Sequence, residues 1–146
     1  MQITDSGVEL ARLYTGDDGE SHLEMVTYAM KPAPNGLVSD PIPVTGMTLR
    51  IWDGGPPVRA SHNSTRRQLI VHLAGAVRVE TSDGASAELG VGSILLSENI
   101  APGKGHESHQ VSMPRLHLIL PFVEGSLDTT LDVVSVEQIE PEAASS

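Results

Sequence analysis

The sequence contains no cysteine, and this absence removes several kinds of chemistry at once. Disulfide bonds, thiolate metal sites and cysteine nucleophiles are excluded, so a metal ion would have to bind oxygen or imidazole nitrogen ligands. Basic residues are also scarce, because 9 lysines and arginines stand against 19 acidic residues and the formal charge is -10. Such a charge repels nucleic acid backbones and anionic lipids. We therefore expect neither nucleic acid nor a membrane as a partner.

Long apolar runs are missing as well. No stretch approaches the roughly 18 apolar residues of a membrane span. The opening MQITDSGVEL has neither the basic start nor the apolar run of a signal peptide, so the default expectation is a cytoplasmic protein. The sequence also lacks the Gly-x-Ser-x-Gly of a serine hydrolase and the spacing of a phosphate-binding loop.

Short runs rich in Val, Ile, Leu and Thr are present instead, separated by 14 glycines and 10 prolines. This pattern predicts an all-β fold, either a sandwich or a barrel. The length of 146 residues fits a single domain over residues 1–140, followed by a flexible C-terminal tail at 141–146. Strands are predicted at 8–14, 22–30, 45–52, 68–73, 76–81, 86–89, 93–97, 107–112, 115–122 and 131–137.

Glycine and proline mark the turns between these strands. Gly75 separates two apolar runs and is predicted to close a hairpin with a positive φ. Asp83-Gly84 is the strongest short hairpin signal in the chain. The segments 32–36 and 53–57, rich in proline and glycine, are predicted as loops in which no strand ladder persists.

Two stretches resemble the conserved motifs of the cupin superfamily, over roughly residues 45–122. In HNSTRRQLIVHLAG, His62, Ser64 and Gln68 have the spacing of the first motif, with Ser64 in place of a histidine and Gln68 in place of a glutamate. The second stretch, GSILLSENIAPGKGH, ends on His106. The resemblance implies a double-stranded β-helix, a jelly-roll barrel with its site inside one end. A homodimer is a further expectation from the resemblance.

The resemblance also implies metal ligands at His62, Gln68 and His106, for a divalent ion such as Fe, Mn, Zn or Ni. Gln68 offers a neutral carbonyl oxygen rather than a carboxylate, so such an ion would be held weakly unless another side chain joined. His72 has the same strand parity as Gln68 and is expected on the same face. His106 is expected to face the barrel interior and His109, three residues further along a strand, to face away.

Further side chains are candidates for binding a substrate. His117 lies between leucines that form the opposite face of its strand, so it is expected to face the cavity. Arg50 and Trp52 share a strand face, where the indole could form an apolar wall and the guanidinium could pair with a substrate carboxylate or enolate. The alternative for this pair is a core tryptophan beside an arginine that reaches the solvent.

Three functions remain open at this point. The first is a metal-dependent oxygenase, isomerase or lyase that acts on a small oxygenated organic substrate. The second is a metal-free isomerase, lyase or cyclase in which His72 and His106 act as acid and base. Arg50, Trp52, Gln68 and His117 would bind the substrate in either enzyme. The third is a small-molecule binding module that has no catalytic activity.

Overall fold

The computed structural model describes residues 2–53, 62–124 and 132–141. Its regular elements are all β-strands, which confirms the all-β prediction for this part of the chain. None of the described residues belongs to a helix with the length and apolarity that crossing a membrane requires. The strands are β1 Gln2–Ile3, β2 Gly7–Thr15, β3 Ser21–Ala29, β4 Lys31–Ala33, β5 Gly36–Val38, β6 Thr48–Trp52, β7 Gln68–Thr81, β8 Ser86–Leu89, β9 Ile94–Glu98, β10 His106–Pro121 and β11 Asp132–Gln138.

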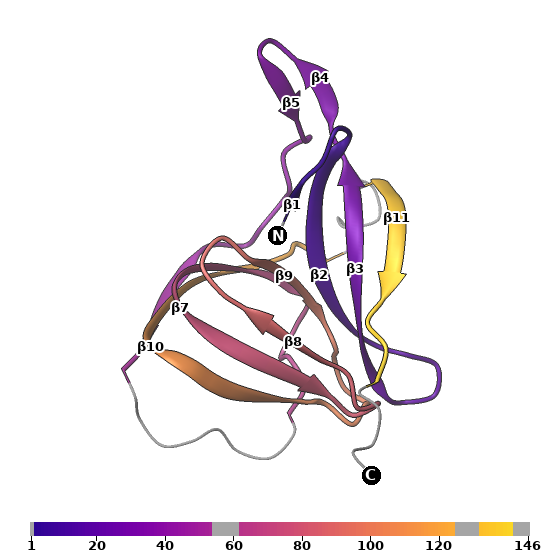
Figure 1. The fold of residues 1–146 in the computed structure, drawn as a ribbon, viewed down its shortest axis with the longest axis vertical. Coiled ribbons are helices and arrows are strands. Elements are labelled where there is room, and N and C mark those ends of the chain that lie inside the picture. The colour runs from indigo at the N-terminus through magenta and orange to yellow at the C-terminus, as the bar shows by residue number, and fades with distance from the viewer. Residues whose placement is uncertain (1, 54–61, 125–131, 142–146) are drawn as a thin grey trace.

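Nine strands form one mixed sheet, with the order β11-β3-β2-β9-β7-β10-β6. Strand β1 pairs with β2 and strand β8 with β7. The pairing of β2 with β9 is parallel, whereas the other pairs in the sheet are antiparallel. In Figure 1, β2, β3 and β11 run upright while β7, β8 and β10 sweep across below them. The sheet is therefore strongly curved, and the part formed by β11, β3 and β2 faces a different direction from the part formed by β7 and β10.

Strands β7 and β10 are the longest elements, and both contain an irregularity near their middle. The prediction that Gly75 closes a hairpin is wrong, because this residue lies inside the continuous strand β7. Its φ of 72° is positive as predicted, but it belongs to a bulge at which β10 also shifts register, between Gln110 and Leu116. A Cβ on Gly75 would lie 2.6 Å from the carbonyl oxygen of Pro114, so only glycine fits. The strands predicted separately at 107–112 and 115–122 are likewise one strand.

The segment predicted as a loop at 32–36 is also different. Strands β4 and β5 pair antiparallel there, and their hairpin projects from the top of the molecule in Figure 1. The turn is made by Pro34 and Asn35, and Asn35 has a φ of 66°. A two-stranded ribbon uses only alternate N–H groups of each strand, so Pro32 can occupy a position whose N–H would point outward.

Other predictions agree with the structure or fall outside it. Asp83-Gly84 does connect the β7–β8 hairpin, and β8 has the predicted bounds. The loop predicted at 53–57 lies outside the described residues except for its first residue. Of the tail predicted at 141–146, only Pro141 is described.

Two apolar clusters form the core. The first joins β2 and β3 to the β7–β9 region, and the second packs β2, β3 and β9 against the end of β10. Burial of a side chain of leucine size contributes about 1.5–3 kcal/mol, so these clusters fix the curl of the sheet. Their buried members are Ala11, Leu13, Leu23, Val77, Val79, Ala85, Leu89 and Leu95 in the first, and Leu10, Val26, Tyr28, Leu96 and Phe122 in the second.

Candidate functional site

A cavity of about 890 Å³, partly open to solvent, is lined by strands β6, β7, β8, β9 and β10 and by the segment 62–66. Its size suits a small organic molecule. Val77, Val79, Leu89 and Leu95 belong to the first core cluster and also line the cavity, so part of its surface is apolar. All of the site residues predicted from the sequence line it, namely Arg50, Trp52, His62, Gln68, His72, His106 and His117.

The described ionisable side chains that line the cavity are all basic. Four histidines and three arginines line the cavity, and none of the described lining residues is an aspartate or glutamate. This contrasts with the whole chain, in which acidic residues outnumber lysines and arginines by 19 to 9. The interior of the cavity is therefore electropositive in an acidic protein.

The bulge in β10 decides which of its histidines face the cavity. His106 and Gln110 line the cavity before the bulge, and Arg115 and His117 line it afterwards, so the inward positions change from even to odd numbers. A regular strand would keep one parity throughout. His109 does not line the cavity and its side chain is 44% exposed. The predicted inward placement of His106 and outward placement of His109 agree with the structure.

Five lining residues form a contiguous patch, which we call the arginine wall: Arg50, Trp52, His72, Arg115 and His117. The register places Arg50, His117 and His72 opposite one another on β6, β10 and β7, and places Trp52 opposite Arg115. The guanidinium carbon of Arg50 lies 4.3 Å from the Trp52 ring centroid, and that of Arg115 lies 5.6 Å away. The negative face of the indole therefore lies close to both cations.

Arg115 is the buried centre of this wall. It is 7% exposed, and its Nε and Nη1 are buried without a hydrogen-bond partner among the described residues. The indole Nε1 of Trp52, both side-chain polar atoms of Gln110 and the Nδ1 of His117 are buried and unpaired in the same way. Burial and the neighbouring charge of Arg50 lower the pKa of Arg115. Several polar groups that normally require partners thus meet in one cavity.

The two histidines of the arginine wall are held in their neutral form. The Nδ1 of His72 lies 3.1 Å from the carbonyl oxygen of Ser93, so a proton on Nδ1 donates to that oxygen and Nε2 keeps a free lone pair. Burial lowers the pKa of His72, and Arg115 adds to this effect. Burial, followed by Arg115, lowers the pKa of His117 to about 4. The two ring centroids are 6.0 Å apart.

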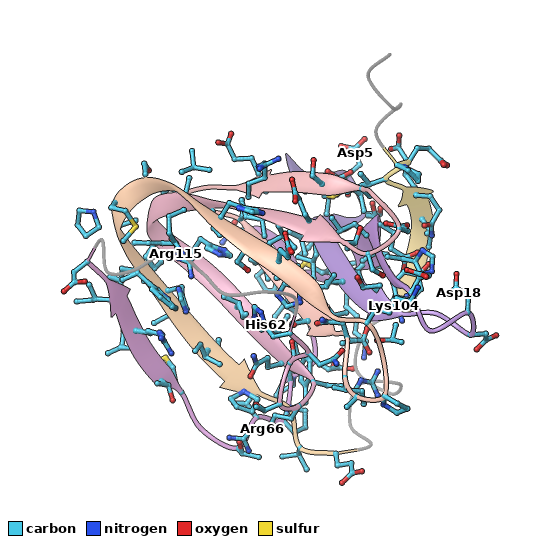
Figure 2. The ribbon with its side chains drawn as sticks, turned by 90° about the horizontal axis from the view of Figure 1, so that it is seen from below. Asp5, Asp18, His62, Arg66, Lys104 and Arg115 are labelled. Atoms are coloured by element: carbon cyan, nitrogen blue, oxygen red, sulfur yellow. The ribbon has the colours of Figure 1, made fainter. Side chains whose placement is uncertain are left out.

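His62 and His106 form a second pair, with ring centroids 4.4 Å apart. Their backbones exchange two hydrogen bonds of 2.9 Å, which bring together residues far apart in the chain. The Oδ1 of Asn99 accepts from Ser64, and its Nδ2 donates to the Nδ1 of His106 at 2.6 Å. A neutral His106 therefore carries its proton on Nε2. Burial, followed by the His62 charge, lowers its pKa to about 4. In Figure 2, His62 and Arg115 lie well apart, so the two histidine pairs occupy different parts of the cavity.

The predicted metal ligands His62, Gln68 and His106 all line the cavity, but their chemistry suits a divalent cation poorly. The Asn99 amide directs the His106 proton to Nε2, which removes that nitrogen as a ligand. Among the described residues, His62 and His106 belong to no group of three or more histidines and carboxylates whose ligand atoms all lie within 4.8 Å of one another. The lining supplies no negative charge, whereas its arginines repel a cation.

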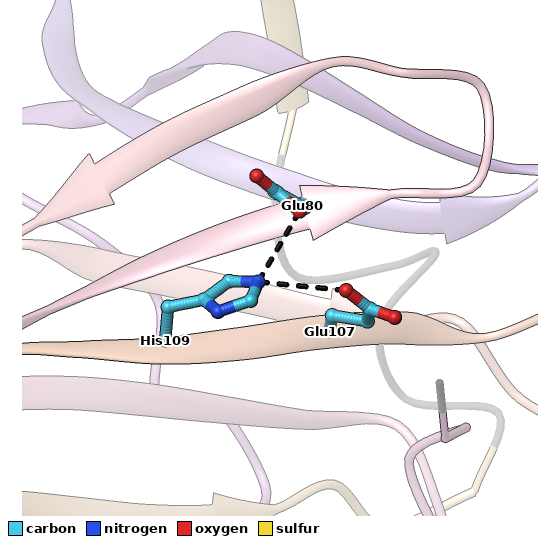
Figure 3. A group of neighbouring side chains, drawn as sticks. All are labelled: Glu80, Glu107 and His109. Atoms are coloured by element: carbon cyan, nitrogen blue, oxygen red, sulfur yellow. Dashed lines mark hydrogen bonds and ion pairs between the residues drawn. The ribbon is translucent and has the colours of Figure 1, made fainter. Parts of the chain in front are cut away.

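A different group of residues has the ligand types of a metal site. Glu80, Glu107 and His109 have ligand atoms within 4.8 Å of one another and could hold a metal ion (Figure 3). They lie on β7 and β10 but do not line the cavity. The Nε2 of His109 is 3.2 Å from Glu80 and 3.5 Å from Glu107, and Arg78 pairs with Glu80 at 2.6 Å. The same contacts are those of an ordinary surface ion-pair network, which forms without a metal ion.

The sequence interpretation missed three residues that shape the site. Arg115 is two positions before His117 on one strand, and this shared parity is the signal that could have identified it. Gln110 follows His106 and Ser108 at two-residue intervals on the same strand, and all three line the cavity. The same alternation could therefore have identified it. Asn99 acts through the side chain of His106, and no spacing in the sequence points to that contact.

No family model matches the chain, and no curated protein matches it.

Proposed function

We propose that this protein is a cupin-type small-molecule binding protein whose cavity catalyses proton transfer on a small oxygenated organic substrate without a metal ion. The observation that carries the proposal is the state of His72. This side chain is 2% exposed, lines the cavity and donates from Nδ1 to Ser93, which leaves Nε2 as a base. A neutral imidazole with a defined tautomer is the common general base of enzymes.

The cupin assignment rests on the resemblance of the sequence motifs. An all-β fold with a strongly curled sheet supports it, as does the meeting of His62 with His106, which belong to the two motifs. The substitutions Ser64 and Gln68 remove two of the ligands expected in metal-dependent members. The metal-free alternative follows from the donor set that remains.

The proposed step is an enolisation. The Nε2 of His72 takes a proton from a carbon next to a carbonyl group, and the C–H electron pair becomes the double bond of an enolate. With a β,γ-unsaturated substrate, return of that proton to the γ-carbon of the dienolate moves the double bond and gives an isomerase. With a substrate that carries a leaving group on the β-carbon, the enolate electrons expel that group to form a carbon–carbon double bond, which gives a lyase. The Nε2–H of His106 is a hydrogen-bond donor for a second oxygen atom of the ligand, and the apolar part of the lining contacts the body of the ligand.

Deuterium exchange tests this proposal directly. A panel of small ketones, oxo acids and lactones is incubated with the protein in deuterated water, and loss of C–H signals is followed by NMR. We expect His72→Gln to slow exchange by about 10²- to 10⁴-fold, the usual contribution of a general base. His109→Gln is the matched control, because it removes a histidine from the outer face of β10.

Three results would contradict the proposal. Exchange in His72→Gln at the rate of the unmodified protein would remove the catalytic role of this histidine. Exchange that a chelator abolishes and an added divalent ion restores would favour the metal-dependent alternative. Ligand-induced thermal stabilisation with no exchange in any compound would identify a binding module instead of an enzyme.

A further inference from the structure

The strongest unexplained feature of the cavity is a buried cation that has no counter-ion in the described part of the chain. Arg115 is 7% exposed and forms no ion pair with a carboxylate among the described residues. Removing a guanidinium from water without pairing it is energetically costly. A bound anion would remove this penalty, whereas a neutral ligand would leave most of it in place.

The surroundings of Arg115 add to its positive field. Arg50 lies on the neighbouring strand β6. Burial lowers the pKa of Arg115, and the charge of Arg50 lowers it further. Besides Arg115, the polar side chains of β7 and β10 that line the cavity carry no negative charge, and they are Gln68, His72, His106, Ser108, Gln110 and His117. The field at the wall is therefore positive and uncompensated.

The unpaired donors define where the anion would bind. Buried N–H groups of Arg115 and of the Trp52 indole lack acceptors among the described residues, and the amide of Gln110 is also unpaired. Trp52 and Arg115 lie directly opposite each other on neighbouring strands. An oxygen anion can accept from such donors, and hydrogen bonds to a charged acceptor are about twice as strong as neutral ones.

The apolar side chains of the lining indicate the chemical character of the rest of the ligand. Val77, Val79, Leu89 and Leu95 supply apolar surface in the same cavity, so the ligand carries an apolar body beside its charge. From these features, and resting on the proposed function because it concerns the same cavity, we infer that the substrate is a small organic carboxylate. Its carboxylate binds at Arg115 and Trp52, with Arg50 as the second cation, and its apolar body lies against the valine and leucine side chains.

Carboxylate binding would also act on the histidines. The charges of Arg115 and Arg50 help to lower the pKa of His117, and Arg115 helps to lower that of His72. A carboxylate at the wall would offset that field, so the pKa of both imidazoles would rise on binding. The anion would thereby make His72 a stronger base at the moment when the substrate is present.

Calorimetric titration with benzoate and with benzamide tests the inference, because the two probes have similar shape and differ in charge. We expect benzoate to bind with a dissociation constant on the order of 1 mM or below, and benzamide at least about 10-fold more weakly. Arg115→Gln should weaken benzoate binding by at least about 10-fold. Arg78→Gln, which makes the same change of charge on the outer face of β7, should leave it unchanged.

A second variant keeps the test valid if Arg115→Gln fails to fold. Arg50 is an exposed residue of the edge strand β6, so Arg50→Gln should fold, and we expect it to weaken benzoate binding by several-fold. Equal binding of benzoate and benzamide, or unchanged benzoate binding in both variants, would overturn the inference. No benzoate binding at about 10 mM would overturn it as well.

The outcomes separate this inference from the proposed function. Benzoate binding that persists in His72→Gln, together with no proton exchange in any variant, would retain the carboxylate site and reject the catalytic role. Proton exchange on neutral ketones that is unaffected by Arg115→Gln, without benzoate binding, would retain the catalytic role and reject the carboxylate site.

Discussion

Arg12 and Arg115 are both withdrawn from solvent, and their surroundings differ in one respect. Arg12, with a side chain that is 30% exposed, lies 2.6 Å from Glu24 and 2.6 Å from Glu98. Glu98 also pairs with Arg67. Arg115 is only 7% exposed and has no carboxylate partner among the described residues. The more deeply buried of the two cations is the one without a counter-ion.

The pKa directions follow this difference. Burial alone would lower the pKa of Arg12, but its hydrogen bonds with Glu98 and Glu24 outweigh burial and the pKa is raised. At Arg115 burial and Arg50 act together, and the pKa is lowered. The network of Arg12, Glu24 and Glu98 serves the stability of the fold, whereas the charge of Arg115 remains available to a ligand.

The largest effect on the free energy of unfolding is expected for a substitution at Gly75, in the bulge of β7 that packs against β10 just before Arg115. A Cβ at Gly75 would lie 2.6 Å from the oxygen of Pro114 and 2.7 Å from that of Ser112, in a backbone with φ of 72°. Steric overlap and strain together predict that Gly75→Ala lowers the free energy of unfolding by about 4 kcal/mol. Chemical denaturation measures this change.

Gly92→Ala is the matched control for that variant. Gly92 also has a positive φ, of 87°, but a Cβ there would meet no atom within 4 Å. Its loss should be limited to backbone strain, about 1 kcal/mol. Equal losses in the two variants would show that the close approach at Gly75 does not matter.

Breaking the paired arginine network is expected to have the next largest effect. Glu98→Gln removes the carboxylate that Arg12 and Arg67 share, and we expect a loss of about 3 kcal/mol in the free energy of unfolding. Glu88→Gln, at an exposed position of β8, should change it by less than about 0.5 kcal/mol. A loss below 1 kcal/mol in Glu98→Gln would mean that the network is not a stabilising element.

A pH dependence of stability distinguishes the cavity histidines from the outer one. The pKa of His117 is about 4 in the folded protein and near 6.5 when unfolded, so between these values the unfolded chain binds more protons. The free energy of unfolding therefore falls as pH is lowered through this window. From about pH 7 to about pH 5.5, His117 contributes a loss of about 1 kcal/mol, and His106 a similar loss.

Urea denaturation at the two pH values measures this dependence. His117→Gln should remove its share of about 1 kcal/mol, because the variant has no proton to gain. His109→Gln should keep the dependence of the unmodified protein. The same dependence in all three proteins would contradict the low pKa of His117.

The smallest change in stability is expected at Arg115 itself. Replacing an unpaired buried charge by a neutral side chain is neutral or stabilising, in contrast to the loss expected for Glu98→Gln. We expect Arg115→Gln, without ligand, to raise the free energy of unfolding by between 0 and about 1 kcal/mol. A loss of about 3 kcal/mol would mean that Arg115 has a structural role like that of Arg12.

Much of the strand pattern and of the site could be predicted from local features. Alternation within a strand correctly placed His72 with Gln68 and Trp52 with Arg50 in the same cavity. The leucines beside His117 correctly indicated its inward face. These inferences succeeded because each depends only on the two-residue period of an extended chain.

The remainder depends on contacts between distant parts of the chain. Gly75 could be recognised as a residue with positive φ, but whether it turns the chain or bends it is decided by its packing against β10. Arg115 has no counter-ion among the residues that the structure describes, and this depends on every element around the cavity rather than on one strand. The hairpin at 31–38 was missed because proline is compatible with a short edge ribbon, where half of the N–H groups have no partner strand.

The most direct measurement is a crystal structure of the protein grown with benzoate. We predict that the carboxylate lies within hydrogen-bonding distance of the Arg115 guanidinium, with the phenyl ring against Val77 and Leu89. A cavity without benzoate at a concentration that saturates calorimetric binding, with the anion bound on the outer surface instead, would contradict the account.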